Sequence, residues 1–70
     1  MAISIDNLRI GLKYHLKNYG ETTDFVVLEK TAAEDFKIKD LNTLETYQFQ
    51  DLIRFGMSND YELYEINLRG

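Results

Sequence analysis

Apolar and polar residues alternate strictly from Leu8 to Leu16, and this run constrains the fold more than any other segment. Its even-numbered positions are all apolar, whereas its odd-numbered positions hold arginine, glycine, lysine or histidine. Because the side chains of a β-strand point alternately to its two faces, the run predicts a strand with one apolar and one basic face. The residues expected to face the core are Leu8, Ile10, Leu12, Tyr14 and Leu16.

A helix is the competing interpretation of the same segment. Asp6 would be its N-cap and Gly20 its C-terminal stop, and near-helical spacing relates Ile5, Leu8, Leu12, Leu16 and Tyr19. Such a helix leaves Ile10 and Tyr14 on its solvent side. It also places Gly11 in its interior, at a cost of about 1 kcal/mol relative to Ala. The strand is therefore favoured.

Four further segments have the length and composition of strands, with aromatic and β-branched residues or alternating polarity. Since the chain has no proline, its turns must be made by Gly, Asn, Asp and Thr. We expect strands over Asp24–Lys30, Asp35–Lys39, Glu45–Gln50 and Tyr61–Leu68. Asp51–Phe55 either extends the fourth strand or makes one helical turn that ends at Gly56. The alternative is an α+β fold with a helix near residues 43–55, capped by Asn42.

Length and composition limit the chain to one small domain, residues 1–70, held together by a hydrophobic core. There is no cysteine and one histidine, so neither a disulfide nor a thiolate zinc site is available. A domain of this size buries only about 60% of the surface of its unfolded chain. The apolar fraction of 44%, with 13% aromatic residues, must supply the core. Dimerisation is another source of buried surface, so the oligomeric state stays open.

Two segments resemble SH3-like β-barrels, namely Leu8–Tyr14 and Lys39–Glu45. The second is similar to a hairpin of such barrels in which an Asp-x-x-Thr-Gly-Glu-like turn joins adjacent strands, with Leu44 standing where Gly is usual. The chain as a whole also resembles a group of small uncharacterised bacterial proteins. The resemblance implies a small five-stranded barrel with a longer first connection and one short helical turn before the last strand. Barrels of this class bind peptides, RNA, methylated side chains or neighbouring subunits, and the fold does not choose among them.

The sequence disfavours enzyme activity and a membrane-spanning segment. The longest apolar run, Phe25–Leu28, is far shorter than the ~20 residues of a membrane span. The first residues lack the pattern of a signal peptide, so a cytoplasmic protein without a membrane partner is expected. No Gly-rich phosphate loop is present, and pairs of nearby carboxylates are expected by chance among 12 acidic residues. We therefore predict no enzyme activity, catalytic residue, metal or cofactor.

Basic residues are concentrated in the first part of an acidic chain. Residues 1–20 hold three basic residues against one acidic residue, whereas residues 21–70 hold five against eleven. The candidate basic patch is Arg9, Lys13 and Lys17, with His15 as a solvated neighbour. Lys37 and Lys39 would add to this patch if their strand and the first strand were neighbours. A nucleic-acid-binding barrel using this face is the alternative function. A net charge of −4 makes nucleic acid an unfavourable partner.

Aromatic residues near the expected loops give the preferred functional hypothesis. Ligand grooves of SH3-like barrels are lined by aromatic side chains from loops and from the helical turn. By position in the pattern, the candidate binding residues are Tyr19, Phe55 and Tyr61. Nearby carboxylates at Glu21, Asp24 and Asp60 favour a basic peptide. The sequence thus predicts a non-enzymatic protein- or peptide-interaction module.

Overall fold

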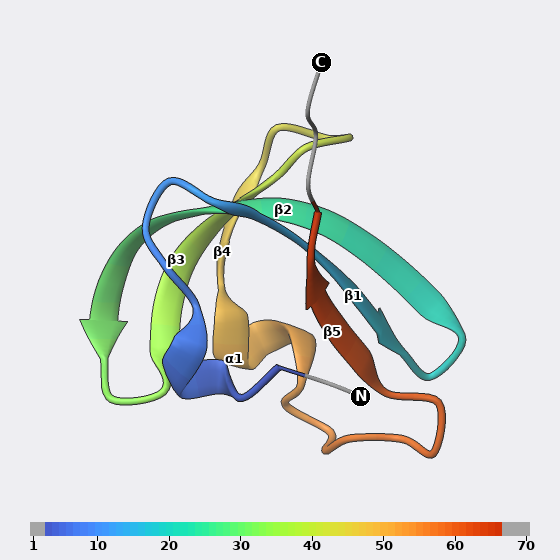
Figure 1. Cartoon of the computed structure of the whole chain (residues 1–70). Coiled ribbons are helices and arrows are strands. Elements are labelled where there is room, and N and C mark those ends of the chain that lie inside the picture. The colour runs from blue at the N-terminus through green and yellow to red at the C-terminus, as the bar shows by residue number, and fades with distance from the viewer. Residues whose placement is uncertain (1–2, 67–70) are drawn as a thin grey trace.

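The computed structural model describes residues 3–66, and these form one open, strongly curved sheet of five antiparallel strands (Figure 1). The strand order is β4-β3-β2-β1-β5. In chain order the elements are the 3-10 turn η1 Ile5–Asn7, β1 Lys13–Asn18, β2 Glu21–Ala32, β3 Asp35–Asp40, β4 Thr46–Gln48, the helix α1 Phe49–Leu52 and β5 Glu62–Glu65. The predicted mainly β fold, with five strands and one short helical turn before the last strand, is confirmed.

The alternating run forms a strand only in its second half. Gly11 has φ +89°, and the N–H of Leu12 donates to the carbonyl of Arg9, so a tight turn precedes β1. Ile10 lies at the tip of that turn and is 62% exposed, which makes its predicted core position wrong. The left-handed conformation that glycine allows is the reason, because it interrupts an extended chain. The other apolar positions are buried, or partly buried in the case of Leu12.

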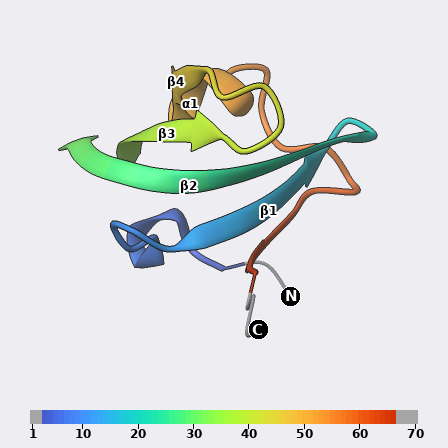
Figure 2. The same ribbon diagram turned by 90° about the horizontal axis from the view of Figure 1, so that it is seen from above.

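A two-residue turn joins β1 to β2, so the expectation of a longer first connection is wrong. Tyr19 and Gly20 make this turn with φ values of +53° and +77°, and Asn18 pairs directly with Glu21. Positive φ at both central positions matches the right-handed twist of the flanking strands and allows the tightest hairpin. β2 then runs for 12 residues and bends across the molecule, pairing with β1 and with β3 (Figure 2).

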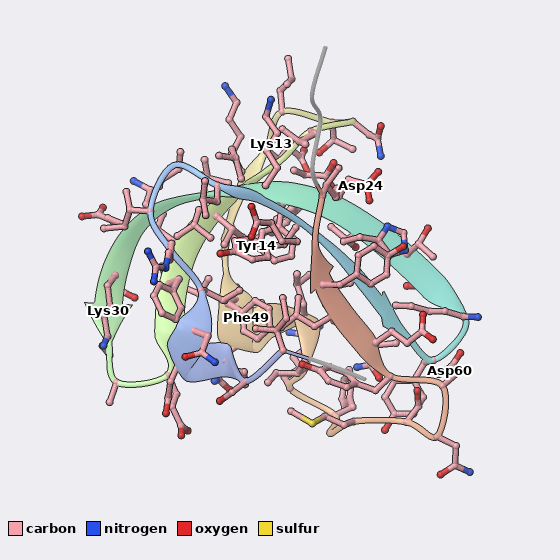
Figure 3. All side chains as sticks on the ribbon, viewed as in Figure 1. Lys13, Tyr14, Asp24, Lys30, Phe49 and Asp60 are labelled. Atoms are coloured by element: carbon pink, nitrogen blue, oxygen red, sulfur yellow. The ribbon has the colours of Figure 1, made fainter. Side chains whose placement is uncertain are left out.

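The core lies on the concave side of the curved sheet, where Tyr14 and Phe49 point inward (Figure 3). Phe25 links these two rings, with its centroid 5.8 Å from that of Tyr14 and 5.9 Å from that of Phe49. Edge-to-face and offset contacts of this kind add to the apolar area that the rings bury. The remaining buried apolar residues are Leu8, Leu16, Val27, Phe36, Ile38 and Leu63.

The alternative helix near residues 43–55 does not form. Instead, Thr46–Gln48 pairs with β3, and a four-residue helix follows directly. Gln48 and Asp51 make a reciprocal capping box at the start of α1. Phe49 is 0% exposed, so burial of its ring against the sheet fixes the point at which strand becomes helix. Tertiary packing has here overruled the local helix signal.

In the β3–β4 connection, Asp40 stands where the SH3-like turn has its aspartate. Leu44 stands where that turn usually has a glycine, at a position with positive φ. The Asp40 carboxylate accepts the N–H groups of Asn42 and Thr43. Leu44 has φ +66° and is 64% exposed. A left-handed conformation is costly for any residue with a Cβ, which explains why glycine is usual there.

At the carboxyl end, β5 completes the sheet beside β1. Leu63 faces the core and is 0% exposed, whereas Tyr64 lies on the outer face. The final part of the predicted strand, residues 67–68, lies outside the described residues. In the part of the chain that is described, no helix has the length and apolar character needed to cross a membrane.

Candidate functional site

One buried amide joins the β1–β2 turn to the segment that follows α1. Asn18, the last residue of β1, is 7% exposed. Its Nδ2 donates to the carbonyl oxygens of Leu52 and Gly56, at 3.4 and 3.1 Å. Its Oδ1 accepts the N–H of Ser58 at 2.9 Å. A buried polar group that meets its hydrogen-bonding needs in this way holds its partners in one arrangement.

A second set of bonds clamps the same turn from the other side. The N–H of Tyr19 donates to Ser58 Oγ and to Asp60 Oδ1, at 2.8 and 3.1 Å, and the N–H of Gly20 donates to Asp60 Oδ2 at 2.8 Å. The Ser58 hydroxyl also contacts the Asp60 carboxylate. Hydrogen bonds from Ser58 and from these backbone N–H groups hold the pKa of Asp60 below its ordinary value, despite an opposing contribution from desolvation. The Asp60 carboxylate therefore accepts its hydrogen bonds from groups of the protein itself.

Two exposed aromatic residues line a hollow at this end of the molecule. Tyr19 is 57% exposed and Phe55 is 78% exposed. The Tyr19 hydroxyl donates to the Phe55 carbonyl at 2.8 Å, so the two residues are tied together although 36 positions separate them. The hollow has a volume of about 580 Å³ and is lined by Asn18, Tyr19, Glu21, Asp51, Leu52, Arg54 and Phe55. We call it the turn groove.

The turn groove carries charges of both signs. Glu21 and Asp51 contribute carboxylates, and Arg54 contributes a guanidinium. Arg54 Cζ lies 5.1 Å from the centre of the Phe55 ring, within cation–π range. Within residues 3–66, no ion pair shorter than 4.0 Å joins Arg54 to either carboxylate.

Of the three predicted binding residues, the structure brings Tyr19 and Phe55 into the turn groove but leaves Tyr61 out of its lining. Tyr61 packs against the hydrophobic core as a partly buried residue. Its hydroxyl is buried and has no hydrogen-bond partner. Burial raises the pKa of Tyr61. This residue therefore belongs to the packing of the domain.

The predicted basic patch is divided by the structure. Lys13 and Lys17 lie on the outer face of β1. Arg9 lies before the strand, and its backbone N–H donates to the Tyr14 hydroxyl. Carboxylates are interleaved with the lysines, because Lys17 pairs in register with Glu62 and its neighbour His15 pairs with Asp24.

His15 is not the solvated surface residue that the sequence predicts. Its side chain is 23% exposed, and its Nδ1 lies 2.5 Å from Asp24 Oδ1. Its ring stacks on Tyr64 with a centroid distance of 5.0 Å. The contact therefore spans three strands on the outer face: β2, β1 and β5.

Lys37 and Lys39, expected to add to the patch if the strands were neighbours, lie on β3, which β2 separates from β1. Lys13 and Lys39 pair with opposite sides of Val26, which puts their backbones roughly 10 Å apart. Among the described residues, no group of three or more His, Cys, Asp or Glu side chains is placed to hold a metal ion.

Three residues that matter to the turn groove escaped the sequence-based prediction, namely Asn18, Asp51 and Arg54. In the sequence, Asn18 stands directly before Tyr19 and Gly20 and indicates only a turn. The available signal was its parity, since it continues the even-numbered face of the alternating run and so points inward. Asp51 and Arg54 line the same hollow as Glu21 although they are far from it in the sequence, which no local pattern reports.

Comparison with family models, with curated proteins and with solved structures finds no match to this chain.

Proposed function

We propose that this protein is a non-enzymatic, cytoplasmic interaction module that binds a short peptide segment of a partner protein in the turn groove. The observation that carries the proposal is the pairing of Tyr19 and Phe55, two strongly exposed aromatic residues fixed at the rim of one hollow. The likeness to SH3-like barrels supports it, because such barrels use loop and helical-turn aromatics in the same way.

Rigidity of the rim favours binding. The turn that carries Tyr19 is held by Asn18, Ser58 and Asp60, and the Phe55 backbone is held by the Tyr19 hydroxyl. A surface that is ordered before the ligand arrives loses less conformational entropy on binding. Tyr and Phe also offer large contact areas with few rotatable bonds, so they are effective anchors.

A peptide with basic character fits the turn groove best. Of the acidic residues expected near the site, Glu21 lines the groove, whereas Asp24 is paired with His15 and Asp60 with the turn backbone. Asp51 adds a second carboxylate at the groove. Nucleic acid is a weaker candidate, because Asp24 and Glu62 interrupt the lysines of the outer face.

Selection from a phage-displayed library of short random peptides tests the proposal. We expect peptides enriched on the wild-type protein to shift the amide resonances of Tyr19, Leu52 and Phe55 when added to a 15N-labelled sample. Phe55→Ala should weaken the binding of these peptides by at least about ten-fold, as loss of a central aromatic anchor does. Because Phe55 is 78% exposed, this change should leave the fold intact.

Two further variants make the result specific. Tyr64→Ala removes another exposed aromatic, on the outer face, and should leave peptide affinity unchanged. Tyr19→Phe keeps the ring but loses the bond to the Phe55 carbonyl, so it should weaken binding less than Phe55→Ala. The proposal is wrong if no peptide distinguishes wild type from Phe55→Ala, or if the resonance shifts map to the outer face.

A further inference from the structure

We propose that Arg54 is a built-in competitor for the turn groove: its guanidinium occupies the face of Phe55 that a cationic side chain of the ligand would take. This inference rests on the proposed function and concerns how the same site is regulated. Arg54 Cζ lies 5.1 Å from the centre of the Phe55 ring. Both residues line the hollow that Tyr19 borders.

The backbone turn that carries both residues places the Arg54 guanidinium close to the Phe55 ring. The N–H of Gly56 donates to the carbonyl of Ile53 at 2.9 Å, so Arg54 and Phe55 are the two central residues of a tight turn. Gly56 has φ +93°, which lets the chain leave the turn toward Ser58. Because the two side chains are neighbours on a fixed turn, the cation reaches the ring with little loss of freedom.

The Phe55 side of that turn is held in place. The Phe55 carbonyl accepts the Tyr19 hydroxyl, and the Gly56 carbonyl accepts the Asn18 amide. The Arg54 side chain has fewer restraints, since Arg54 is exposed and no ion pair within residues 3–66 holds its guanidinium. A ligand can therefore displace the guanidinium without disturbing the backbone that carries the ring.

Charge decides what kind of group displaces it. Glu21 and Asp51 line the same hollow, and no cation of residues 3–66 lies within 4.0 Å of either carboxylate. When Arg54 leaves the ring, the aromatic face and the two carboxylates attract a positive charge from the ligand. A neutral side chain of the same shape gains less from this exchange. We therefore assign to the turn groove a ligand that presents an arginine or lysine side chain.

The competition is tested with Arg54→Ala and one selected groove-binding peptide. The peptide is made in two forms, with its basic residues intact and with each replaced by citrulline or norleucine. Removing the internal cation should tighten binding of the basic form by about two- to five-fold, the range of a solvent-exposed cation–π contact. It should leave the neutral form unchanged. Both affinities are measured by isothermal titration calorimetry.

Matched controls separate this contact from a general change in charge. Lys30 lies over another ring, that of Phe36, at the opposite end of the molecule from Asp60 (Figure 3). Lys30→Ala should therefore leave the affinity unchanged. Glu21→Gln should weaken the basic form, whereas Glu34→Gln, an exposed glutamate in the β2–β3 turn, should not.

Each result distinguishes the inference from the proposed function. If the peptides bind at Tyr19 and Phe55 but need no basic residue, the function stands and the competitor role is wrong. Weaker binding to Arg54→Ala also overturns that role, because it means that Arg54 donates to the ligand, as it would to a carboxylate. If Phe55→Ala has no effect on any peptide, the proposed function fails first.

Discussion

Asn18 is a buried polar residue at the end of β1, and both ends of its amide are used. It pairs with the carbonyls of Leu52 and Gly56 on one side and with the N–H of Ser58 on the other. Alanine cannot replace these bonds. Its introduction would leave two carbonyls and one N–H without partners in a place that water reaches poorly.

We predict that Asn18→Ala destabilises the domain by about 1–3 kcal/mol, the usual cost of orphaning buried polar groups. The free energy of unfolding is measured by urea denaturation. Asn59→Ala is the matched control, because Asn59 is an exposed asparagine in the α1–β5 connection that Asn18 holds. Equal losses of stability in the two variants would contradict the role given to Asn18.

At the scale of the elements, the short connections carry conformations that their sequences only partly favour. The β1–β2 turn has a glycine at one of its two positive-φ positions and a tyrosine at the other. The β3–β4 connection has Leu44 with φ +66°, exposed and away from the core. Because the Leu44 side chain is exposed, its packing does not offset the strain of its backbone.

Replacing Leu44 with glycine should therefore stabilise the domain. The left-handed conformation destabilises a residue that has a Cβ by roughly 1–2 kcal/mol, and glycine removes this strain. Glycine also loses more conformational entropy on folding, which offsets roughly 0.5–1 kcal/mol of the gain. We expect a net gain of about 0.5–1 kcal/mol, seen as a higher thermal midpoint in circular dichroism. Leu44→Ala keeps the Cβ and should show no gain. A lower midpoint for the glycine variant would mean that the leucine side chain contributes packing.

At the scale of the whole molecule, the two ends of the long, bent β2 have different surroundings. Its first residue, Glu21, lines the turn groove, whereas its last residues pair with β3 and no longer with β1. The outer face between them mixes Lys13 and Lys17 with Asp24 and Glu62. Within residues 3–66, these carboxylates interrupt the positive charge that contacts with a phosphate backbone require.

We therefore predict that a short single-stranded RNA leaves the spectrum of a 15N-labelled sample unchanged at about 0.15 M ionic strength. Lys13, Lys17 and His15 are the amides to follow. Shifts at these residues that fade as salt is added would contradict the prediction, because loss of affinity with salt is the signature of phosphate contacts. They would favour a nucleic-acid function for the outer face.

The sequence was a good guide wherever burial follows from a local period. Alternation placed Tyr14 and Leu16 in the core, and the Phe25–Leu28 run is part of a strand as expected. It failed at Ile10, where one glycine in the left-handed region ends the extended chain. It also failed to separate Tyr61, a packing residue, from Tyr19 and Phe55, because aromatic residues near turns look alike until their surroundings are known.

What the sequence determined by itself is the class of the fold and the residues available for a core, since hydrophobic periodicity and turn chemistry act over a few positions. The tertiary structure alone decided which residues form the turn groove. Tyr19 and Phe55 are 36 positions apart, and they meet because the segment after α1 packs against the β1–β2 turn, where the Asn18 amide holds it. Long-range contacts of this kind follow from the packing of the whole chain, and no short segment carries them.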